Sequence, residues 1–408
     1  MNVLTVNKFY YRKGGSETYL FALEEGLKKR AYNPIPFSMK DEKNHKSPTE
    51  KYFVDNIDYS KTGIIEKVKL AGKIIYSTEA KRNLNSLLDM NRIELAHLHI
   101  FQHQLSPSIL FPLKKQGIPI VYTVHDLKML CPNYKMLTNG SVCEKCKGGK
   151  FYNATLNKCT KNSYLKSAIN TFEAYVHSFL NIYTDYIDHF ITPSDFYRQK
   201  LLEWGVPENK VTFIPNFVDT TKYEPVYKTE KYFLYLGRLS EEKGIMTLLE
   251  AIKKSKENIQ LKIVGGGPLE NELEEFVISN NLQNKVTLEG FKSGEDLDNL
   301  ISKCKAVVMP SEWYENGPLS LIESFAKGKI VIGSKIGGIP EHIDEFKNGF
   351  LFEPGNVLEL SEKLNYVNNL EDEVIEEMGR NSRNKVEEIY NEDYHFKKLL
   401  SIYESVRK

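Results

Sequence analysis

The chain has 408 residues, of which 41% are hydrophobic and 27% are charged. At roughly 100–200 residues per domain this length predicts two domains, and the composition excludes a wholly disordered chain and a collagen-like fibre. No run reaches ~18 consecutive apolar residues, which argues against a membrane-spanning helix. Residues 1–8 lack a basic stretch followed by an apolar one, so we expect a strand there instead of a signal peptide, and a cytoplasmic protein.

The net charge of +1 is divided unevenly along the chain. Residues 1–217 contain 30 basic and 20 acidic residues, a net of +10, whereas residues 218–408 contain 25 and 34, a net of −9. This asymmetry indicates two domains with different partners. The basic half could bind an anionic acceptor or an anionic membrane surface, although a drift of surface charge would give the same count.

In the first half, short apolar runs alternate with helical patterns. Strands are expected at Val3–Val6, Ile35–Phe37, Leu95–Ile100, Ile118–Val124 and His189–Thr192. A helix is expected from Ser16, its N-cap, to about Arg30. This alternation predicts a parallel sheet with helices on both faces.

The alternation restarts after a hinge that we predict at Ile214–Asp219, where Pro215 and Pro225 flank a non-periodic stretch. Further strands are expected at Tyr232–Leu236, Ile259–Val264, Lys285–Leu288, Ala306–Met309, Ile330–Ser334 and Gly349–Phe352. We therefore predict an α/β protein with two doubly wound, parallel-sheet domains, residues 1–217 and 218–390. The last helix, within residues 391–408, is expected to pack back on the first domain.

Two glycine-rich loops follow predicted strands, at the sheet edge where open α/β proteins bind ligands. Gly14-Gly15 would let backbone N–H groups approach a phosphate, or would form an ordinary strand-to-helix turn. Gly265-Gly266-Gly267-Pro268 begins like the dinucleotide fingerprint, but Glu270 stands where its third glycine belongs. This departure disfavours a nicotinamide dinucleotide and leaves a single nucleoside diphosphate as the candidate ligand.

Charged residues follow two other predicted strands of the second half. Arg238 and Lys243 place two cations at one strand–helix junction, which suits a pyrophosphate unless the intervening Glu241 and Glu242 pair with them.

Glu315 precedes a helix that opens at Gly317-Pro318, and Glu323 lies one to two turns inside it. This spacing offers a carboxylate for sugar hydroxyls, a helix N-terminus for phosphate and a carboxylate for ribose, with Glu312 as a competitor for the role of Glu315.

Taken in chain order, these motifs resemble the retaining, nucleotide-sugar-dependent glycosyltransferases of family 4, the group 1 glycosyltransferases. The motifs that carry the resemblance are Gly14-Gly15, His125-Asp126, Arg238 with Lys243, Gly265–Pro268, Glu315 with Glu323, and Gly337-Gly338-Ile-Pro-Glu341. The resemblance covers nearly the whole chain and is densest over residues 232–345. It implies the GT-B architecture, in which two Rossmann-like domains face a cleft, the N-terminal one binding the acceptor and the C-terminal one the nucleotide.

The resemblance also implies roles for individual residues. Arg238 and Lys243 would bind the donor diphosphate, Glu315 the donor sugar, and His125 the sugar near the reacting centre. Asp126 would orient His125 or assist the acceptor, unless it is a helix N-cap. Other residues that would bind the donor are Gly14, Gly15, Gly237, Gly265, Gly267, Phe291, Gly317, Pro318, Leu319 and Glu323.

The implied reaction transfers a sugar from a nucleoside diphosphate sugar, UDP-linked in preference to GDP-linked, to a hydroxyl with retention. The expected acceptor is a glycan or a polyprenyl-linked glycan. The reaction would belong to the synthesis of a cell-surface polysaccharide at the inner face of the membrane. No catalytic metal is expected, because the leaving phosphate would take the acceptor proton in a front-face reaction. Asp296-x-Asp298 matches the short acidic motif of metal-dependent transferases, but it falls at a helix start, where we expect solvated acids of the first turn. The alternatives are a nucleotide-sugar epimerase and a non-catalytic nucleotide-sugar-binding protein; nucleic-acid binding is not expected.

Four of the five cysteines, Cys131, Cys143, Cys146 and Cys159, lie within 29 residues, in an insertion at about 128–162. Their spacing favours a structural Cys₄ zinc site over free or redox-active thiols and over disulfides. A second cluster, His97, His99 and His103, lacks cysteine or acid partners and is expected to line a cleft or the core.

Apolar side chains recur at near-helical spacing across residues 164–186. The favoured interpretation is a helix whose apolar side packs on the sheet. The alternative is an amphipathic helix that faces a membrane and helps the enzyme reach a lipid-linked acceptor.

Overall fold

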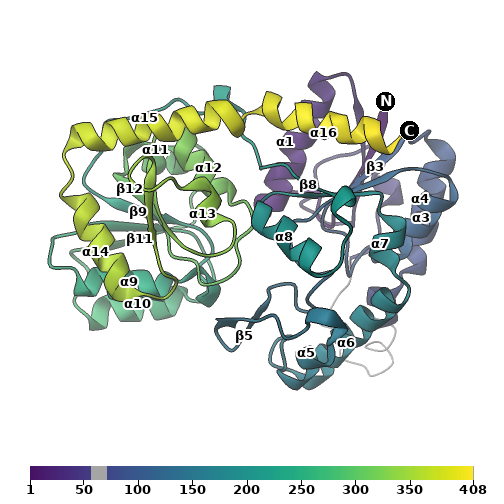
Figure 1. The fold of residues 1–408 in the computed structure, drawn as a ribbon, viewed down its shortest axis with the longest axis horizontal. Coiled ribbons are helices and arrows are strands. Elements are labelled where there is room, and N and C mark those ends of the chain that lie inside the picture. The colour runs from purple at the N-terminus through teal and green to yellow at the C-terminus, as the bar shows by residue number, and fades with distance from the viewer. Residues whose placement is uncertain (57–70, 408) are drawn as a thin grey trace. The chain divides into compact units, whose positions relative to one another are not determined.

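The computed structural model describes residues 1–56 and 71–407, which form two α/β units (Figure 1). Unit 1 comprises residues 1–138, 143–214 and 396–408, and unit 2 comprises residues 139–142 and 215–395. Residues 57–70, inside the predicted first domain, and residue 408, at the end of the predicted last helix, lie outside the described residues.

The core of unit 1 is a six-stranded parallel sheet in the order β2-β1-β3-β4-β7-β8. Its strands are β1 (Asn2–Val6), β2 (Asn33–Phe37), β3 (Leu95–Leu98), β4 (Ile120–Thr123), β7 (His189–Thr192) and β8 (Val211–Phe213). Every residue of β3 and β4 is buried, as expected for central strands that helices cover on both faces. The strand order reverses between β1 and β3, which places the loops after these strands at the usual ligand-binding edge.

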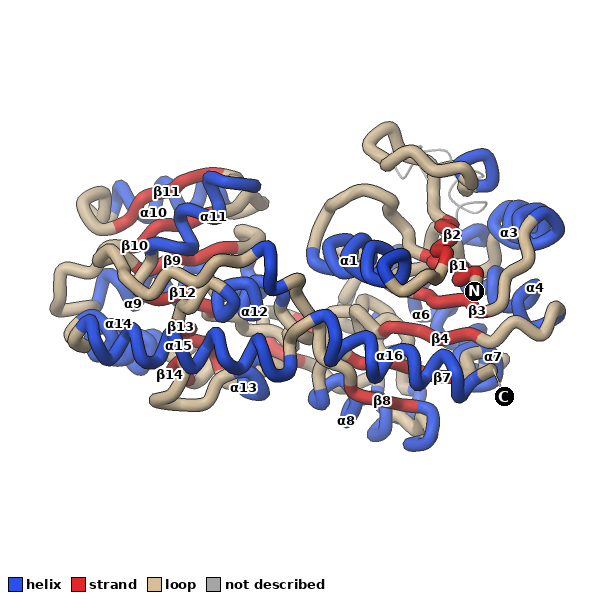
Figure 2. The backbone as a smooth tube through the Cα atoms, turned by 90° about the horizontal axis from the view of Figure 1, so that it is seen from above, coloured by secondary structure: helices blue, strands red, loops and turns tan. Residues whose placement is uncertain are grey.

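Helices that the structure describes connect these strands (Figure 2), and a short hairpin lies between β4 and β7. The helices are α1 (Gly15–Lys29), α3 (Thr78–Met90), α4 (Leu110–Lys115), α5 (Tyr152–Leu156), α6 (Tyr164–Phe179), α7 (Ile182–Tyr186) and α8 (Asp195–Glu203). The hairpin joins β5 (Leu137–Thr138) to β6 (Ser141–Val142). The N-cap of α1 is Gly14 and not Ser16, so no side chain caps the first turn of this helix.

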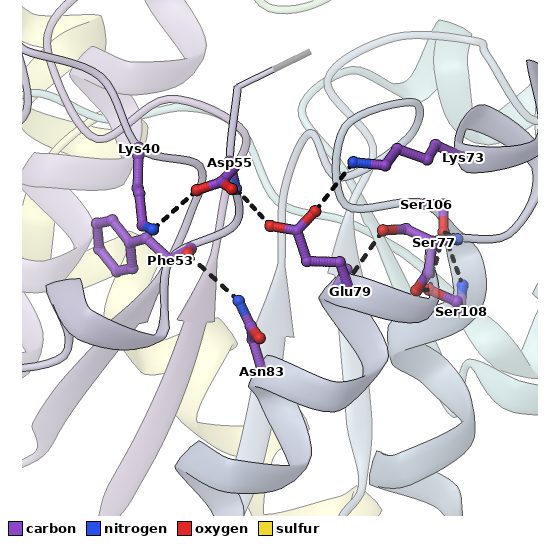
Figure 3. Close-up of polar contacts among 10 residues, drawn as sticks. Lys40, Phe53, Asp55, Lys73, Ser77, Glu79, Asn83, Ser106 and Ser108 are labelled. Atoms are coloured by element: carbon purple, nitrogen blue, oxygen red, sulfur yellow. Dashed lines mark hydrogen bonds and ion pairs between the residues drawn. The ribbon is translucent and has the colours of Figure 1, made fainter. Parts of the chain in front are cut away.

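Side chains and backbone groups from three segments fix the start of α3 (Figure 3). The Ser77 hydroxyl caps the helix by accepting from the Ala80 N–H at 3.1 Å, while the Ser77 N–H donates to Ser106 at 2.8 Å. In the first turn, Glu79 accepts from the Asp55 N–H at 2.8 Å and pairs with Lys73 at 3.1 Å. Residues on both sides of the segment 57–70 are thereby tied to one helical turn.

The last helix, α16 (Glu392–Val406), begins in unit 2 and contributes its larger part to unit 1. Its Tyr403 hydroxyl lies 2.6 Å from Nδ1 of His97, whose Nε2 lies 2.7 Å from the Thr123 hydroxyl. The Arg30 guanidinium of α1 stacks over the Phe396 ring at 4.2 Å. His97 is therefore a core residue with both ring nitrogens hydrogen-bonded.

Unit 2 is built on a second six-stranded parallel sheet, in the order β11-β10-β9-β12-β13-β14. Its strands are β9 (Phe233–Leu236), β10 (Leu261–Val264), β11 (Val286–Gly290), β12 (Ala306–Met309), β13 (Ile330–Ser334) and β14 (Gly349–Phe352). Its helices are α9 (Ile245–Lys254), α10 (Glu270–Ser279), α11 (Gly294–Lys303), α12 (Leu319–Ala326), α13 (Ile339–His342), α14 (Val357–Asn368) and α15 (Asp372–Ile389). Two apolar clusters fill the space between the sheet and the helices on its two faces.

The stretch 164–186 differs from its predicted packing. It forms two helices, because Asn181 adopts a left-handed conformation (φ 46°) between α6 and α7. The buried residues of α6 are polar or small, namely Ser167, Asn170, Thr171, Glu173 and His177. The interpretation that the apolar side packs on the sheet is therefore wrong: Leu165, Phe172 and Phe179 are 64%, 60% and 87% exposed.

Polar contacts explain this inverted orientation. Glu173 of α6 accepts from Lys128 at 2.8 Å, and both side chains are buried. His177 Nε2 lies 3.0 Å from the Ile75 carbonyl, and Thr155 of α5 donates to Thr171 at 2.8 Å.

Within residues 1–56 and 71–407, no helix has both the length and the apolar composition of a membrane-spanning segment.

Candidate functional site

A buried ion pair lies at the switch point of unit 2, where the strand order reverses between β9 and β12. Lys243, in the loop after β9, donates to Glu315 Oε1, in the loop after β12, at 2.6 Å. The Ser311 hydroxyl and the Trp313 indole N–H donate to the same oxygen at 2.6 and 3.0 Å. The sequence places these residues at one sheet edge, and the structure brings two of the predicted site residues into direct contact.

Burial raises the pKa of Glu315, but the Lys243 ammonium and the hydrogen bonds from Ser311 and Trp313 outweigh it and hold the pKa below its ordinary value. Glu315 is therefore an anion at neutral pH. All three donors use Oε1, and within the described residues no hydrogen bond to Oε2 is found. A ligand hydroxyl can donate to this second oxygen.

Two glycines hold the loops that carry this pair. Gly244 has φ +64°, and a side chain there would overlap the Pro310 carbonyl. Gly337 has φ +59°, and a side chain there would overlap the backbone of Glu315, which also accepts from the Gly338 N–H at 2.8 Å. Gly337 and Gly338 therefore position Glu315, a role that the sequence motif alone did not reveal.

The glycines after β9 and β10 lie against each other. The Leu239 N–H donates to Gly266 O at 3.1 Å, and side chains at Gly265 or Gly267 would overlap the backbone of Gly237 or Leu239. This close approach accounts for Gly265 and Gly267 without a ligand. Their predicted contact with phosphate stays a prediction.

The other predicted donor-binding residues of unit 2 lie at the same sheet edge but make few contacts with one another. Arg238 is exposed and forms no ion pair with any residue that the structure describes. Glu323, in α12, accepts from the Tyr223 hydroxyl at 3.1 Å, which adds Tyr223 to the site. Phe291, after β11, is 79% exposed.

The start of α12 and the acidic residues near it complete this edge. Pro318 precedes Leu319 as N-cap and supplies no side-chain cap, while the Gly317 carbonyl accepts from Asn216 at 2.6 Å. Glu312 accepts from Thr247 and so holds the loop to α9. Asp298 lies in α11 and pairs with Lys327 at 2.6 Å.

In unit 1, His125 follows β4 and meets a second histidine. Its Nε2 lies 3.1 Å from Nδ1 of the buried His99, which follows β3, and Tyr19 packs edge-on against both rings. Burial lowers the pKa of His125 to about 3 and that of His99 well below its ordinary value. Both rings are therefore neutral at pH 7 and can take part in hydrogen bonds without carrying a charge.

A carboxylate and a lysine lie beside this pair. Asp126 accepts from the Lys128 N–H at 3.0 Å, which makes it a turn residue, and burial raises its pKa. Burial and Lys13 lower the pKa of Lys8, which follows β1, to about 8, against the opposing effect of Asp126 and Glu17. The sequence analysis did not single out Lys8, although a cation two residues after the end of a buried strand could have indicated it.

The predicted phosphate loop of unit 1 lies at the start of α1. Gly14 and Gly15 are exposed, and Gly14 is the extended N-cap residue. The buried Glu17 accepts from Asn7 at 3.1 Å and from the Ser16 hydroxyl at 3.0 Å, which fixes the turn. The contact of this helix end with a phosphate, which the motif predicts, stays a prediction.

All five cysteines are free thiols in the structure. Four of them, Cys131, Cys143, Cys146 and Cys159, line one cavity. As the side chains stand in the structure, no group of three or more His, Cys, Asp or Glu among the described residues is arranged so that it could hold a metal ion. Burial raises the pKa of Cys131 to about 11, and burial with the three other cysteines raises that of Cys146 to about 12.

Two family models match the chain. The model described as Glycosyltransferase Family 4 matches residues 13–222, half of the chain, and the model of glycosyl transferases group 1 matches residues 219–385. A putative colanic acid biosynthesis glycosyltransferase, WcaL, of Escherichia coli K12 is 25% identical over 225 residues, which are 52% of this chain and 55% of that protein. The chain thus spans about half the length of this curated relative.

Solved structures match over both units. Sucrose-phosphate synthase of Thermosynechococcus elongatus superposes with a TM-score of 0.72 at 19% identity, covering 99% of this chain and 98% of that one. HepE of Anabaena, solved in complex with UDP and glucose, superposes with a TM-score of 0.71 at 16% identity, covering 99% and 100%. These likenesses confirm the predicted GT-B fold class.

The neutral state of His125 predicts a pH dependence of stability. Between pH 6.5 and 3 the unfolded chain binds a proton at this residue that the native chain does not, so the free energy of unfolding falls as the pH falls. Replacing His125 by Gln removes this contribution. Urea unfolding between pH 4 and 5.5 should give the wild type a slope steeper by about 1.4 kcal/mol per pH unit.

The matched control is His45→Gln, at an exposed histidine of the same unit. Equal slopes for the wild type and His125→Gln would show that His125 is protonated in the native protein.

Proposed function

Because the chain belongs to the family 4, group 1 glycosyltransferases, we propose that it transfers a sugar from a nucleoside diphosphate sugar to a hydroxyl acceptor. The observation that carries the proposal is the Lys243–Glu315 pair at the switch point of unit 2. It places an ammonium for a diphosphate beside a carboxylate whose free oxygen can accept from sugar hydroxyls.

The donor is a UDP-sugar in this proposal, in preference to a GDP-sugar. HepE, which shares the fold, was solved with UDP and glucose. In this chain Arg238 and Lys243 would hold the diphosphate, with the uncapped start of α12 adding its positive end, and Glu323 would accept from the ribose hydroxyls. The exposed Phe291 ring would lie against the base.

The reaction proceeds with retention in this proposal, without a catalytic metal. The bond from the anomeric carbon to the diphosphate oxygen breaks, the acceptor oxygen bonds to the same face, and the acceptor proton moves to the leaving phosphate. Arg238, Lys243 and the α12 N-terminus stabilise the departing charge. In unit 1, the neutral His125, held by His99, would hydrogen-bond a sugar hydroxyl.

The acceptor is a lipid-linked glycan of a cell-surface polysaccharide, and unit 1 docks on the inner membrane face to reach it. The exposed apolar side of α6, with Tyr152 and Leu156 of α5, supplies the surface that enters the lipid interface. Residues 143–181 contain six lysines and two glutamates, a net of +4, and one of these glutamates is the buried Glu173. Exposed apolar side chains within a segment of net positive charge fit an anionic lipid surface.

The donor site predicts how two variants bind nucleotide sugars. With a panel of UDP-, GDP- and ADP-sugars in a calorimeter, the wild type should bind one UDP-sugar, and Lys243→Ala and Glu323→Ala should each bind it at least tenfold more weakly. Each variant loses a charged partner of the ligand, and tenfold is about 1.4 kcal/mol. Lys303→Ala, which removes an exposed lysine of α11 paired with Glu230, should bind as the wild type does.

Product analysis separates the transferase from its two rivals. Slow release of UDP, and an acceptor product with the anomeric configuration of the donor, are expected. Interconversion of free nucleotide sugars would indicate an epimerase, and binding without release of UDP a non-catalytic protein. If no nucleotide sugar bound, or both variants bound normally, the assignment of the donor site would be wrong.

The membrane surface predicts a loss of vesicle binding. Phe172→Ser with Phe179→Ser should reduce co-sedimentation with vesicles of anionic phospholipid several-fold, because two exposed rings no longer enter the interface. Vesicles of zwitterionic lipid should bind the wild type more weakly. Ile278→Ser, at a 62% exposed position of α10 in unit 2, is the control; wild-type binding by the double variant would contradict the docking surface.

A further inference from the structure

The four clustered cysteines come from separate parts of the insertion and converge on one cavity. Cys131 ends the turn after His125-Asp126, Cys143 follows β6, Cys146 precedes a short 3₁₀ turn, and Cys159 follows α5. The cavity has a volume of about 10 Å³. This is the room that a single atom the size of a water molecule needs, roughly 10–15 Å³.

The insertion has little apolar material to hold it together. Its described buried apolar residues are Leu130, Cys131, Met136, Cys146, Phe151 and Ala154, and the last three form a small cluster of their own. Its regular structure around the cavity is a hairpin of two-residue strands and the five-residue helix α5. Hydrophobic burial on this scale stabilises a fold only weakly, so small segments of this kind commonly need a cross-link.

The backbone of the same segment is held in costly conformations. Six residues other than glycine have a positive φ between positions 134 and 162, namely Tyr134, Met136, Asn139, Lys158, Lys161 and Asn162. Such conformations are uncommon for side chains other than Asn, and they persist only where the surroundings enforce them. The small apolar cluster does not provide that enforcement.

We propose that Cys131, Cys143, Cys146 and Cys159 bind one zinc ion as a structural Cys₄ site. Four thiolates at the ordinary Zn–S distance of about 2.3 Å form the tetrahedron that zinc prefers, and Cys143-x2-Cys146 has the spacing of a zinc knuckle. Binding requires no oxidant: four S–H groups give up their protons, and four Zn–S bonds form. The energy of these bonds then enforces the strained backbone.

The side chains around the cavity are compatible with such a site. In the structure, the thiol of Cys131 donates to Asn133 Oδ1 at 3.0 Å and that of Cys159 to the Thr138 hydroxyl at 3.6 Å. Rotation of these side chains exchanges the two weak hydrogen bonds for metal bonds. Asn133, Asn153 and Asn157 also line the cavity, and their amide N–H groups can donate to thiolates, as partners of metal ligands commonly do.

The zinc would stabilise two features on which the proposed activity depends. The Cys131 N–H donates to the Leu127 carbonyl at 2.8 Å, directly after His125-Asp126. Lys128 joins the Pro132 carbonyl to Glu173 of α6, with both distances 2.8 Å. The site therefore fixes the loop behind His125 and the base of the exposed helix, but its ligand chemistry does not rest on the proposed reaction.

Metal analysis of the full-length protein, purified without chelators, tests the proposal. Elemental analysis by inductively coupled plasma mass spectrometry should find one zinc per chain. Cys146→Ser should lose the zinc, and Cys304→Ala, which removes the buried fifth cysteine in unit 2, should retain it. Cobalt substituted for zinc should give the absorption bands of a tetrahedral thiolate complex.

A second measurement does not depend on the folding of a variant. Titration of the wild type with a mercurial reagent should release one zinc for every four thiols that react, as followed with a chromogenic chelator. A chain without metal that has five titratable thiols would overturn the proposal. So would an intact mass lower by 2 or 4 Da, because it would show that the cysteines form disulfides.

Discussion

The carboxylate of Glu315 is the constraint around which the edge of unit 2 is organised. A buried anion is stable only when it is paired and hydrogen-bonded, because its transfer from water is costly. Lys243, Ser311 and Trp313 meet this requirement, and they come from the loops after two different strands. The glycine at 244 follows from the same requirement, since it lets the Lys243 loop approach Pro310 closely enough to form the pair.

The edge of unit 1 is organised in a different way. Three histidines lie in or just after strands β3 and β4. His97 is hydrogen-bonded to Tyr403 and Thr123, and His99 is hydrogen-bonded to His125. Burial keeps His99 and His125 neutral, whereas the Glu315 site of unit 2 carries full charges. In the proposed reaction, the neutral groups of unit 1 would bind sugar hydroxyls, and the Lys243 ammonium of unit 2 would bind the diphosphate.

The strands of both sheets could be predicted because each is a short apolar run bounded by turn residues. All six strands of unit 2 were predicted within a few residues, but β8 in unit 1 was missed because three residues beside Pro215 show no period. The sequence also predicted that Lys243 and Glu315 lie at one edge of this sheet. Their contact across 72 positions could not be predicted, because it depends on how two loops pack.

The orientation of α6 could not be predicted from the sequence, for a different reason. Periodicity reveals that a helix has an apolar and a polar side, but it does not say which side is buried. In this chain, Lys128 and Glu173 decide the matter: if the helix were turned over, Glu173 would move to the surface and Lys128 would be left as an unpaired buried charge. The polar contacts thus specify the orientation, and the apolar side stays at the surface.

Helix α6, whose apolar side is exposed and whose buried side chains are polar or small, needs a rigid base. The hydrogen bonds from Thr171 and Asn170 lead from α6 to α5 and to Thr160, next to Cys159. The Lys128 contact leads to Pro132, next to Cys131. Both routes end at the cysteine cavity, so a cross-link there would hold α6 at two points. Without one, the ion pair would rest on a segment that has almost no core of its own, and its geometry, on which the energy of a buried pair depends, would not be maintained.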